Sequence, residues 1–168
     1  MSCPLPGSET PVSPNADSGQ EMPDGDDACV EVDTRYGKLL CFADDTIVSR
    51  SLSYYGEWAQ DEIDFLTSLV SEGDVVVDIG AFIGTHTIAL AQAVGSGGQV
   101  LAFEPNPSTS RLLKANIARL HLDNVKISNA PVADARSLAT AAAATVPNAL
   151  PNELRMYVAT AAISRSDR

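Results

Sequence analysis

The stretch VVVDIGAFIG, residues 75–84, constrains the fold of this chain more than any other feature. Residues 75–79, which open with three valines and contain Asp78, predict a strand that is apolar on both faces, as in the interior of a parallel sheet. Gly80 and Gly84 follow in a short loop, and the apolar run 85–94 then predicts a helix. A buried strand that ends in an acid and leads through such a loop into a helix is typical of a ligand-binding edge.

The alternation of strand and helix continues downstream. Residues 99–103 predict a second strand, and we expect Ser108 to cap a helix that runs to about His121. The segment NVKISN, residues 124–129, predicts a third strand. Strand, helix, strand, helix, strand is the pattern of a doubly wound α/β fold, here a Rossmann-like partial parallel sheet. Right-handed crossovers predict the strand order 3-2-1, with a possible fourth strand beside the first.

Composition and charge limit the kinds of partner that this chain is expected to bind. The formal net charge is −11, so the chain is a poor candidate for binding nucleic acid through phosphate neutralisation. No apolar run reaches the ~18 residues that span a bilayer, so no membrane partner is predicted. Cys3, Cys29 and Cys41 lack metal-ligand spacing, so no metal site is predicted. Their odd number and the absence of a secretory pattern at the N-terminus predict a cytoplasmic location.

Two cofactor chemistries compete for the loop after Asp78. A dinucleotide-binding loop would place a glycine where Phe82 stands, because the backbone must approach a pyrophosphate closely there. Asp78 would also repel a pyrophosphate. Both features favour S-adenosylmethionine, which has a cationic ammonium and sulfonium and no phosphate, so that a nearby carboxylate attracts it.

A second acid supports the same interpretation. The predicted second strand, in VLAFEPNP, leads directly into Glu104, about 20 residues beyond Gly84. A carboxylate at this position can accept hydrogen bonds from both hydroxyls of a ribose, as an acid does in dinucleotide-binding folds. Asp78 and Glu104 would then bracket the sites for the amino-acid and ribose groups of the cofactor.

The segment from about Asp33 to Asp134 resembles the FkbM-type S-adenosylmethionine-dependent methyltransferases. The resemblance is carried by GEW at residues 56–58, by the DIGAFIG loop, by FEPNP and by the strand that begins with NV. It implies a class I methyltransferase fold and O-methylation of a sugar or natural-product hydroxyl, with a small molecule or glycan as the partner. It also implies cofactor contacts, which on this sequence fall on Asp78, Gly80, Ala81, Gly84 and Glu104, with Asn129 as a weaker candidate for the adenine edge.

Two features separate the chain from the family that it resembles. Members usually carry Asn where this chain has Phe82, and they continue into a fourth strand followed by K-x-D-x-E-G, which residues 135–168 do not contain. The catalytic residues are therefore left unassigned. Two hypotheses stand side by side: an active methyltransferase, and a truncated, catalytically silent fragment that serves as a cofactor-binding or interaction module.

Four segments are expected along the chain. Residues 1–30, which contain six acids and no Lys or Arg, are predicted to be a disordered acidic tail. Residues 31–72 are predicted to form a hairpin, from the alternating pattern of residues 29–52, and a helix, from the helical spacing of apolar residues in 57–73. Residues 73–134 are predicted to form the cofactor-binding methyltransferase half-domain. Residues 135–168 are an Ala-rich, atypical segment with a weak strand candidate at Met156–Ile163. That candidate, or a partner chain or oligomer covering the sheet edge, would pair with the first strand, which is too apolar to lie unpaired.

Other side chains have alternative interpretations. His86 is a candidate base in the first turn of the helix after the loop, although a residue there more often packs or faces solvent. Tyr54, Tyr55 and Trp58 either wall a substrate pocket or pack the N-terminal element against the sheet.

Overall fold

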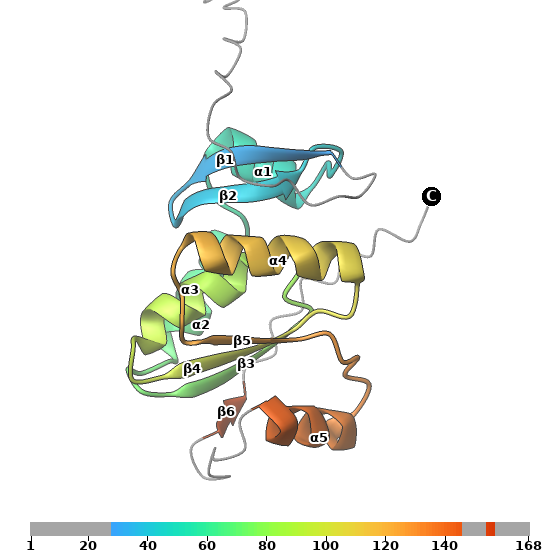
Figure 1. Cartoon of the computed structure of the whole chain (residues 1–168). Coiled ribbons are helices and arrows are strands. Elements are labelled where there is room, and N and C mark those ends of the chain that lie inside the picture. Colours follow the sequence, from blue (N-terminus) through green and yellow to red (C-terminus); the bar gives the residue numbers. More distant parts are fainter. Residues whose placement is uncertain (1–27, 146–153, 157–168) are drawn as a thin grey trace, which may run out of the picture.

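The elements of this computed structural model are arranged in layers (Figure 1). The structure describes residues 28–145 and 154–156, so nearly all of the predicted acidic tail lies outside the described residues. A two-stranded antiparallel hairpin, β1 (Cys29–Thr34) and β2 (Gly37–Phe42), lies over helices that cover a parallel sheet, and a further helix lies on the opposite face of that sheet.

Within the described residues the sheet has four strands in the order β5-β4-β3-β6. β3 (Val75–Ile79), β4 (Gln99–Phe103) and β5 (Val125–Ser128) are parallel neighbours, which confirms the predicted 3-2-1 order. β6 (Leu154–Met156) pairs in parallel with the other side of β3. The neighbour that β3 requires is therefore supplied by the same chain. Of the predicted strand there, only its first residue is in β6, and residues 157–163 lie outside the described residues.

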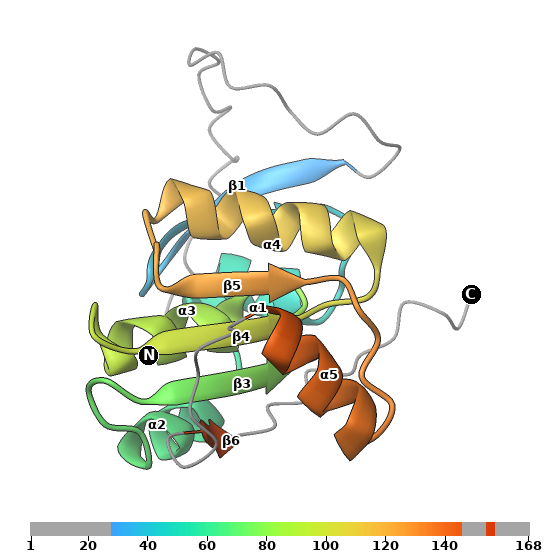
Figure 2. The same cartoon turned by 60° about the horizontal axis from the view of Figure 1, so that its bottom comes forward.

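Two helices cover one face of the sheet, α3 (Thr85–Val94) and α4 (Pro107–Arg119) (Figure 2). α3 has the predicted bounds, whereas the cap of α4 corrects the prediction. The side chain of Asn106, not that of Ser108, caps this helix, accepting hydrogen bonds from the N–H groups of Ser108 and the next residue at 2.9 and 3.2 Å. Pro107 fits the first helical position, where a missing N–H group costs nothing, so the helix begins earlier than predicted.

Two other helices differ from the sequence-based expectation. α1 (Val48–Tyr55) lies where the alternating pattern predicted a continuation of the hairpin, and its buried Val48 and Leu52 are one helical turn apart. α5 (Ala135–Thr145) opens the Ala-rich segment, for which no helix was predicted, and alanine is the strongest helix former. The predicted helix of the N-terminal element is α2 (Gln60–Ser68).

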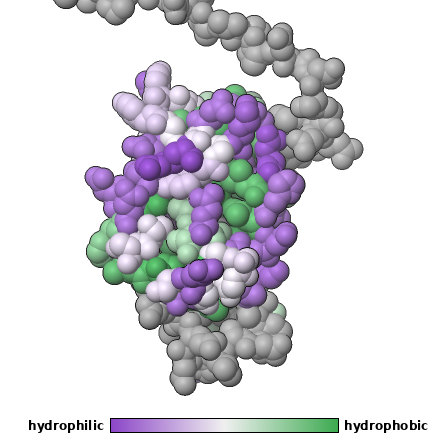
Figure 3. Space-filling view, turned by 90° about the vertical axis from the view of Figure 1, so that its left-hand side faces the viewer, coloured by the Kyte–Doolittle hydropathy of each residue, from purple (hydrophilic) through white to green (hydrophobic). Residues whose placement is uncertain are grey.

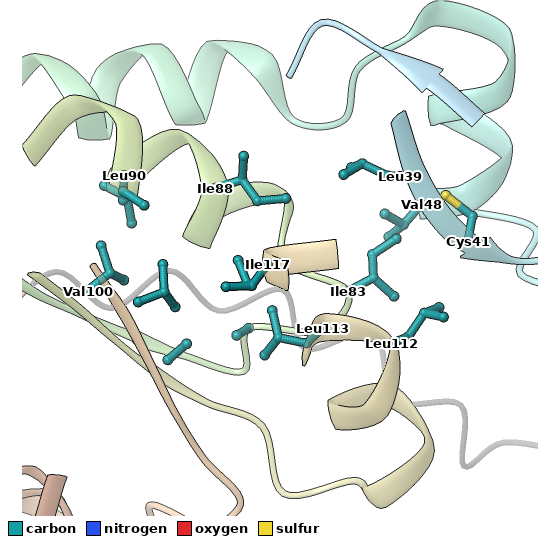
Figure 4. Close-up of a cluster of buried hydrophobic side chains, with 14 of the residues drawn as sticks. Leu39, Cys41, Val48, Ile83, Ile88, Leu90, Val100, Leu112, Leu113 and Ile117 are labelled. Carbon is teal, nitrogen blue, oxygen red and sulfur yellow. The ribbon is translucent and has the colours of Figure 1, made fainter. Parts of the chain in front are cut away.

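The buried apolar side chains form two clusters, one on each face of the sheet. The large cluster joins the sheet to the hairpin and to α1, α3 and α4 (Figure 4), and its labelled members include Leu39, Val48, Ile83, Ile88, Val100, Leu113 and Ile117. The small cluster consists of Val77, Leu101, Phe103 and Leu138. Because side chains alternate along a strand, Val76 and Val100 face the large cluster, while Val77 and Leu101 face the small one.

Seen from one side, the surface is mainly hydrophilic with apolar areas between (Figure 3). Tyr54 and Tyr55 are 71% and 78% exposed, whereas Trp58 packs against the large cluster. The structure therefore separates the three aromatic residues that the sequence places close together, and only Trp58 follows the packing alternative. None of the described helices combines the length and apolar character needed to span a bilayer.

Candidate cofactor site

The site predicted from the sequence lies where β3 and β4 end side by side. Asp78 is the fourth residue of β3, and Glu104 directly follows Phe103 at the end of β4. The backbone N–H groups of Gly80 and Ala81 both donate to the carbonyl oxygen of Phe103, at 2.9 and 3.1 Å, which holds the loop across the end of β4. The structure thus brings the loop and both predicted acids to one edge of the sheet.

Glu104 is held by backbone donors on both of its oxygens. Its Oε2 accepts a hydrogen bond from the N–H of Phe82 at 2.9 Å, and its Oε1 accepts one from the N–H of Asn106 at 2.9 Å. The side chain is buried. A carboxylate offers about four acceptor sites, so each oxygen keeps capacity for a further donor such as a ribose hydroxyl. The carboxylate is therefore oriented before any ligand binds.

Phe82 stands at the glycine position of the loop with a left-handed backbone, at φ 51°. This conformation costs a non-glycine residue about 1–2 kcal/mol. The bond from its N–H to Glu104 and the packing of its ring against Phe42 of β2, with centroids 6.2 Å apart, oppose that cost. Because the N–H groups of Gly80, Ala81 and Phe82 are all engaged within the protein, they are not available to cradle a pyrophosphate, in line with the sequence-based argument.

Asp78 is 0% exposed and its two oxygens have different surroundings. Oδ2 accepts a hydrogen bond from the hydroxyl of Thr87 at 2.5 Å, whereas Oδ1 has no partner among the described residues. Burial raises the pKa of Asp78 to about 7; the bond from Thr87 opposes this rise, and the negative charge of Glu104 adds to it. A buried carboxylate oxygen without a partner is costly, and a cationic ligand group would satisfy it. The unpartnered acceptor oxygen of Asp78 therefore fits the cationic end of S-adenosylmethionine.

The small residues of the loop have different surroundings. A Cβ atom added to Gly80, at φ 81°, would meet no atom within 4 Å, so open space borders the loop there. At Gly84, with φ 104°, an added Cβ would lie 2.8 Å from Cδ1 of Leu113, so this glycine lets α3 pack closely against α4. Ala81 is buried in the large cluster. The cofactor contacts expected of these three residues stay predictions, and Gly80 has the free space that such a contact requires.

Asn129 and His86 lie in contrasting places. Asn129 is exposed directly after β5, where its Oδ1 accepts a hydrogen bond from Nζ of Lys114 at 3.0 Å, and its adenine contact stays a prediction. His86 is buried, with Nε2 3.9 Å from Oε1 of Glu62 in α2. Burial lowers the pKa of His86, so the ring is neutral at pH 7. The burial of the ring is what the packing alternative expects, whereas a neutral ring is compatible with either role, so a role for His86 as a base stays a prediction. The described residues hold no cluster of three His, Cys, Asp or Glu side chains arranged for a metal ion.

Sequence reasoning missed the polar side chains that hold the site together. Asn116 of α4 accepts a hydrogen bond from the N–H of Leu40 at 2.7 Å and donates to the carbonyl oxygens of Leu40 and Ile83 at 3.0 and 2.9 Å. It thereby ties β2 to the loop after β3. An asparagine on an otherwise apolar helix face is the signal that could have identified it. Thr87 carries no comparable signal, because its partner Asp78 is separated from it by the loop.

A parallel 3-2-1 sheet with acids at the ends of its first two strands, and a loop unsuited to pyrophosphate, defines a Rossmann-like class I methyltransferase domain. The family model of the TRM5/TYW2 methyltransferase domain matches residues 46–162, more than two thirds of the chain. The chain belongs to this family, and its cofactor is S-adenosylmethionine, as predicted. The match supports the S-adenosylmethionine-dependent methyltransferase class and does not support the FkbM type specifically.

Known methyltransferases resemble parts of the chain. A protein-L-isoaspartate O-methyltransferase of Methanococcus aeolicus is 34% identical over 58 residues, covering 34% of this chain and 27% of that protein. One from Methanocella arvoryzae is 33% identical over 58 residues, covering 34% of this chain and 31% of its own length. The chain thus spans less than a third of these curated relatives. The solved complex of aTrm5 with tRNALeu is 25% identical, with a TM-score of 0.48, covering 66% of this chain and 31% of that one.

Proposed function

We propose that this chain binds S-adenosylmethionine at the carboxyl ends of β3 and β4 and presents its methyl group to an acceptor. The observation that carries this proposal is the pair of acids at that edge. Asp78 has a buried oxygen without a partner, and Glu104 is oriented by two backbone donors. When bound, the cofactor supplies an electrophilic methyl group on a positively charged sulfur. Membership of a methyltransferase family supports the same chemistry.

The residues of the site have separate tasks in this proposal. The ionised carboxylate of Asp78 binds the cationic amino group of the cofactor, and Glu104 accepts hydrogen bonds from the ribose hydroxyls. The open space at Gly80 leaves room for the ligand beside the loop, and Asn129 borders the adenine. Since methyl transfer depends mainly on alignment of the acceptor with the methyl group, the contribution of this chain is to bind and orient.

The resemblance to the FkbM type and the match to the TRM5/TYW2 family each support a different class of methyl acceptor. The FkbM-type resemblance supports a sugar or natural-product hydroxyl. The TRM5/TYW2 family supports transfer RNA, because Trm5, one of the two proteins that name it, is found with tRNALeu in a solved complex. The sequence-based prediction against nucleic acid rests on the net charge of −11, and an RNA acceptor would require a local basic surface. Transfer RNA is the acceptor that we propose to test first.

The cofactor assignment is tested by calorimetry of S-adenosylmethionine binding to the parent chain, Asp78→Ala and Glu104→Ala. Each substitution removes a hydrogen bond that involves a charged group, so we expect affinity to fall by about 10- to 100-fold. Asp123→Ala is the matched control, since Asp123 is an exposed acid before β5, at the opposite end of the strands. Absence of binding by the parent, or equal binding by all four proteins, would contradict the proposal.

Methyl transfer is tested separately with methyl-labelled S-adenosylmethionine. Unmodified transfer RNA forms one arm, and sugars and hydroxylated natural products form the other. Label in the RNA would support the TRM5/TYW2 type of acceptor, and label in a hydroxyl compound the FkbM type. Binding without transfer to either class would favour the alternative function, a catalytically silent cofactor-binding module.

A further inference from the structure

Thr87 lies in the first turn of α3 and is fully buried, with its hydroxyl 2.5 Å from Oδ2 of Asp78. Hydrogen bonds to an ionised carboxylate are short and strong, and burial excludes water that would compete with this one. The hydroxyl carries a single proton, so it engages one carboxylate oxygen and leaves the other.

The oxygen that Thr87 leaves is the one without a partner. Oδ1 of Asp78 is buried and has no hydrogen-bond donor among the described residues. The bond from α3 fixes the orientation of the carboxylate, because rotation about its terminal torsion would break the contact at Oδ2. Oδ1 is thus the carboxylate oxygen at the end of β3 whose capacity to accept a hydrogen bond is not used within the described residues.

We propose that Thr87 is a positioning residue for the cofactor: its hydroxyl holds Asp78 so that Oδ1 is available to the cationic amino group of S-adenosylmethionine. This inference rests on the proposed function, because it assigns a role within that site. Thr87 acts through Asp78 and does not itself touch the cofactor. A purely structural role for Thr87, in which its methyl group and hydroxyl only fill space under α3, is the alternative that the test must separate.

The charges around Asp78 decide what such a test can measure. Glu104 acts on Asp78 from the end of β4 and raises its pKa. The titratable group of α3 is His86, which is neutral at pH 7, and β6 brings Arg155 at the register position of Val76. The bond from Thr87 lowers the pKa of Asp78. Removal of the hydroxyl therefore moves the ionisation of Asp78 to higher pH, and binding that needs the carboxylate moves with it.

The experiment compares the parent chain with Thr87→Val, which keeps the shape of the side chain without the hydroxyl, and with Thr87→Ser, which keeps the hydroxyl. The probe is S-adenosylmethionine, and its Kd is measured by calorimetry from pH 6 to pH 8.5. If the hydrogen bond is worth one pKa unit, Thr87→Val binds about tenfold more weakly than the parent at pH 6 and less than about twofold more weakly at pH 8.5. Thr87→Ser should stay within about threefold of the parent throughout.

The ratio of two Kd values removes the titration of the cofactor's own amino group, since both proteins bind the same ligand. A ratio that does not change with pH, a Thr87→Ser variant as weak as Thr87→Val, or a Thr87→Val variant equal to the parent would each overturn the inference. Thermal unfolding checks that the variants are folded, and Thr87→Ala replaces Thr87→Val if the latter is not. A parent chain that binds no cofactor refutes the proposed function and this inference with it, whereas binding that Thr87→Val leaves unchanged refutes the inference alone.

Discussion

The two faces of the sheet are covered by clusters of buried apolar side chains that differ greatly in size. On one face the large cluster joins the strands to α3, α4, α1 and the hairpin, and on the other the small cluster joins three strand residues to Leu138 of α5. The two acids of the candidate site belong to the first face. Asp78 follows Val77 of the small cluster along β3, so its side chain lies on the opposite face, where it accepts a hydrogen bond from Thr87 of α3. The cofactor edge is therefore supported from the large-cluster face.

The loop after β3 packs on the same face as the large cluster. Ala81 and Ile83 are members of the large cluster, and Phe82 packs against Phe42 of the hairpin. Damage to the large cluster should therefore reach both stability and cofactor binding. Damage to the small cluster should lower stability and leave the loop in place.

The largest expected effect contrasts one leucine from each face. Leu113→Ala removes a buried side chain that lies against Gly84 in the large cluster, and we expect it to lower the free energy of unfolding by about 3–5 kcal/mol. Leu138→Ala removes the contribution of α5 to the small cluster, and we expect the free energy of unfolding to fall by about 2 kcal/mol or less. The loss is smaller because the side chain of Leu138 has few buried apolar neighbours, so its removal costs few packing contacts. Urea unfolding measures both, and equal losses would show that the faces contribute alike.

A second prediction concerns the polar bridge on the large-cluster face. Asn116→Ala leaves the N–H and carbonyl of Leu40 and the carbonyl of Ile83 without the partner they have now, so we expect a loss of about 2–3 kcal/mol. Asn129→Ala is the matched control, since that asparagine is exposed and should cost less than about 0.5 kcal/mol. Thermal unfolding of the two variants makes the comparison, and a mild Asn116→Ala variant would show that the bridge is dispensable.

The smallest expected effect depends on pH. The pKa of Asp78 in the folded chain is raised to about 7, above its value in the unfolded chain, so the folded state holds this proton more tightly. Its contribution to stability is fully present below the unfolded-state pKa of about 3.8 and is lost as pH rises through 7. Asp78→Asn removes this titration, so its stability relative to the parent should rise by about 1.4 kcal/mol between pH 6 and pH 8, the interval over which about one pKa unit of the shift is lost. Urea unfolding at a series of pH values measures the difference, and a constant difference would contradict the shift.

The part of the fold that the sequence predicted is the part with a clear apolar period. β3, α3 and β4 have the predicted bounds because each is a continuous or regularly spaced apolar segment between glycines or turn residues. α1 and α5 were missed for different reasons. α1 is two turns long and follows an alternating hairpin, and α5 is so rich in alanine that no apolar period stands out.

The candidate site also has one part that the sequence pattern predicts and another that depends on tertiary packing. The positions of Asp78 and Glu104 at neighbouring strand ends follow from the strand pattern, because parallel strands end at one edge. The complete burial of Asp78 and its bond to Thr87 depend on how α3 packs on β3, which no local pattern contains. The cap of α4 shows the same limit on a smaller scale, since Asn106 and Ser108 are both good capping residues and only the geometry selects Asn106.

The pairing of β6 with β3 has a consequence for the order in which the chain is made. β3, β4 and β5 lie within residues 75–128, so these three strands of the sheet can assemble early on the ribosome. β6 begins at Leu154, roughly 80 residues after β3 starts, and at ordinary elongation rates this distance corresponds to several seconds. Throughout that interval the outer edge of β3 is open to strands of neighbouring nascent chains. The time between the synthesis of β3 and of β6 is thus the period in which an unpaired strand edge exposes the chain most to aggregation.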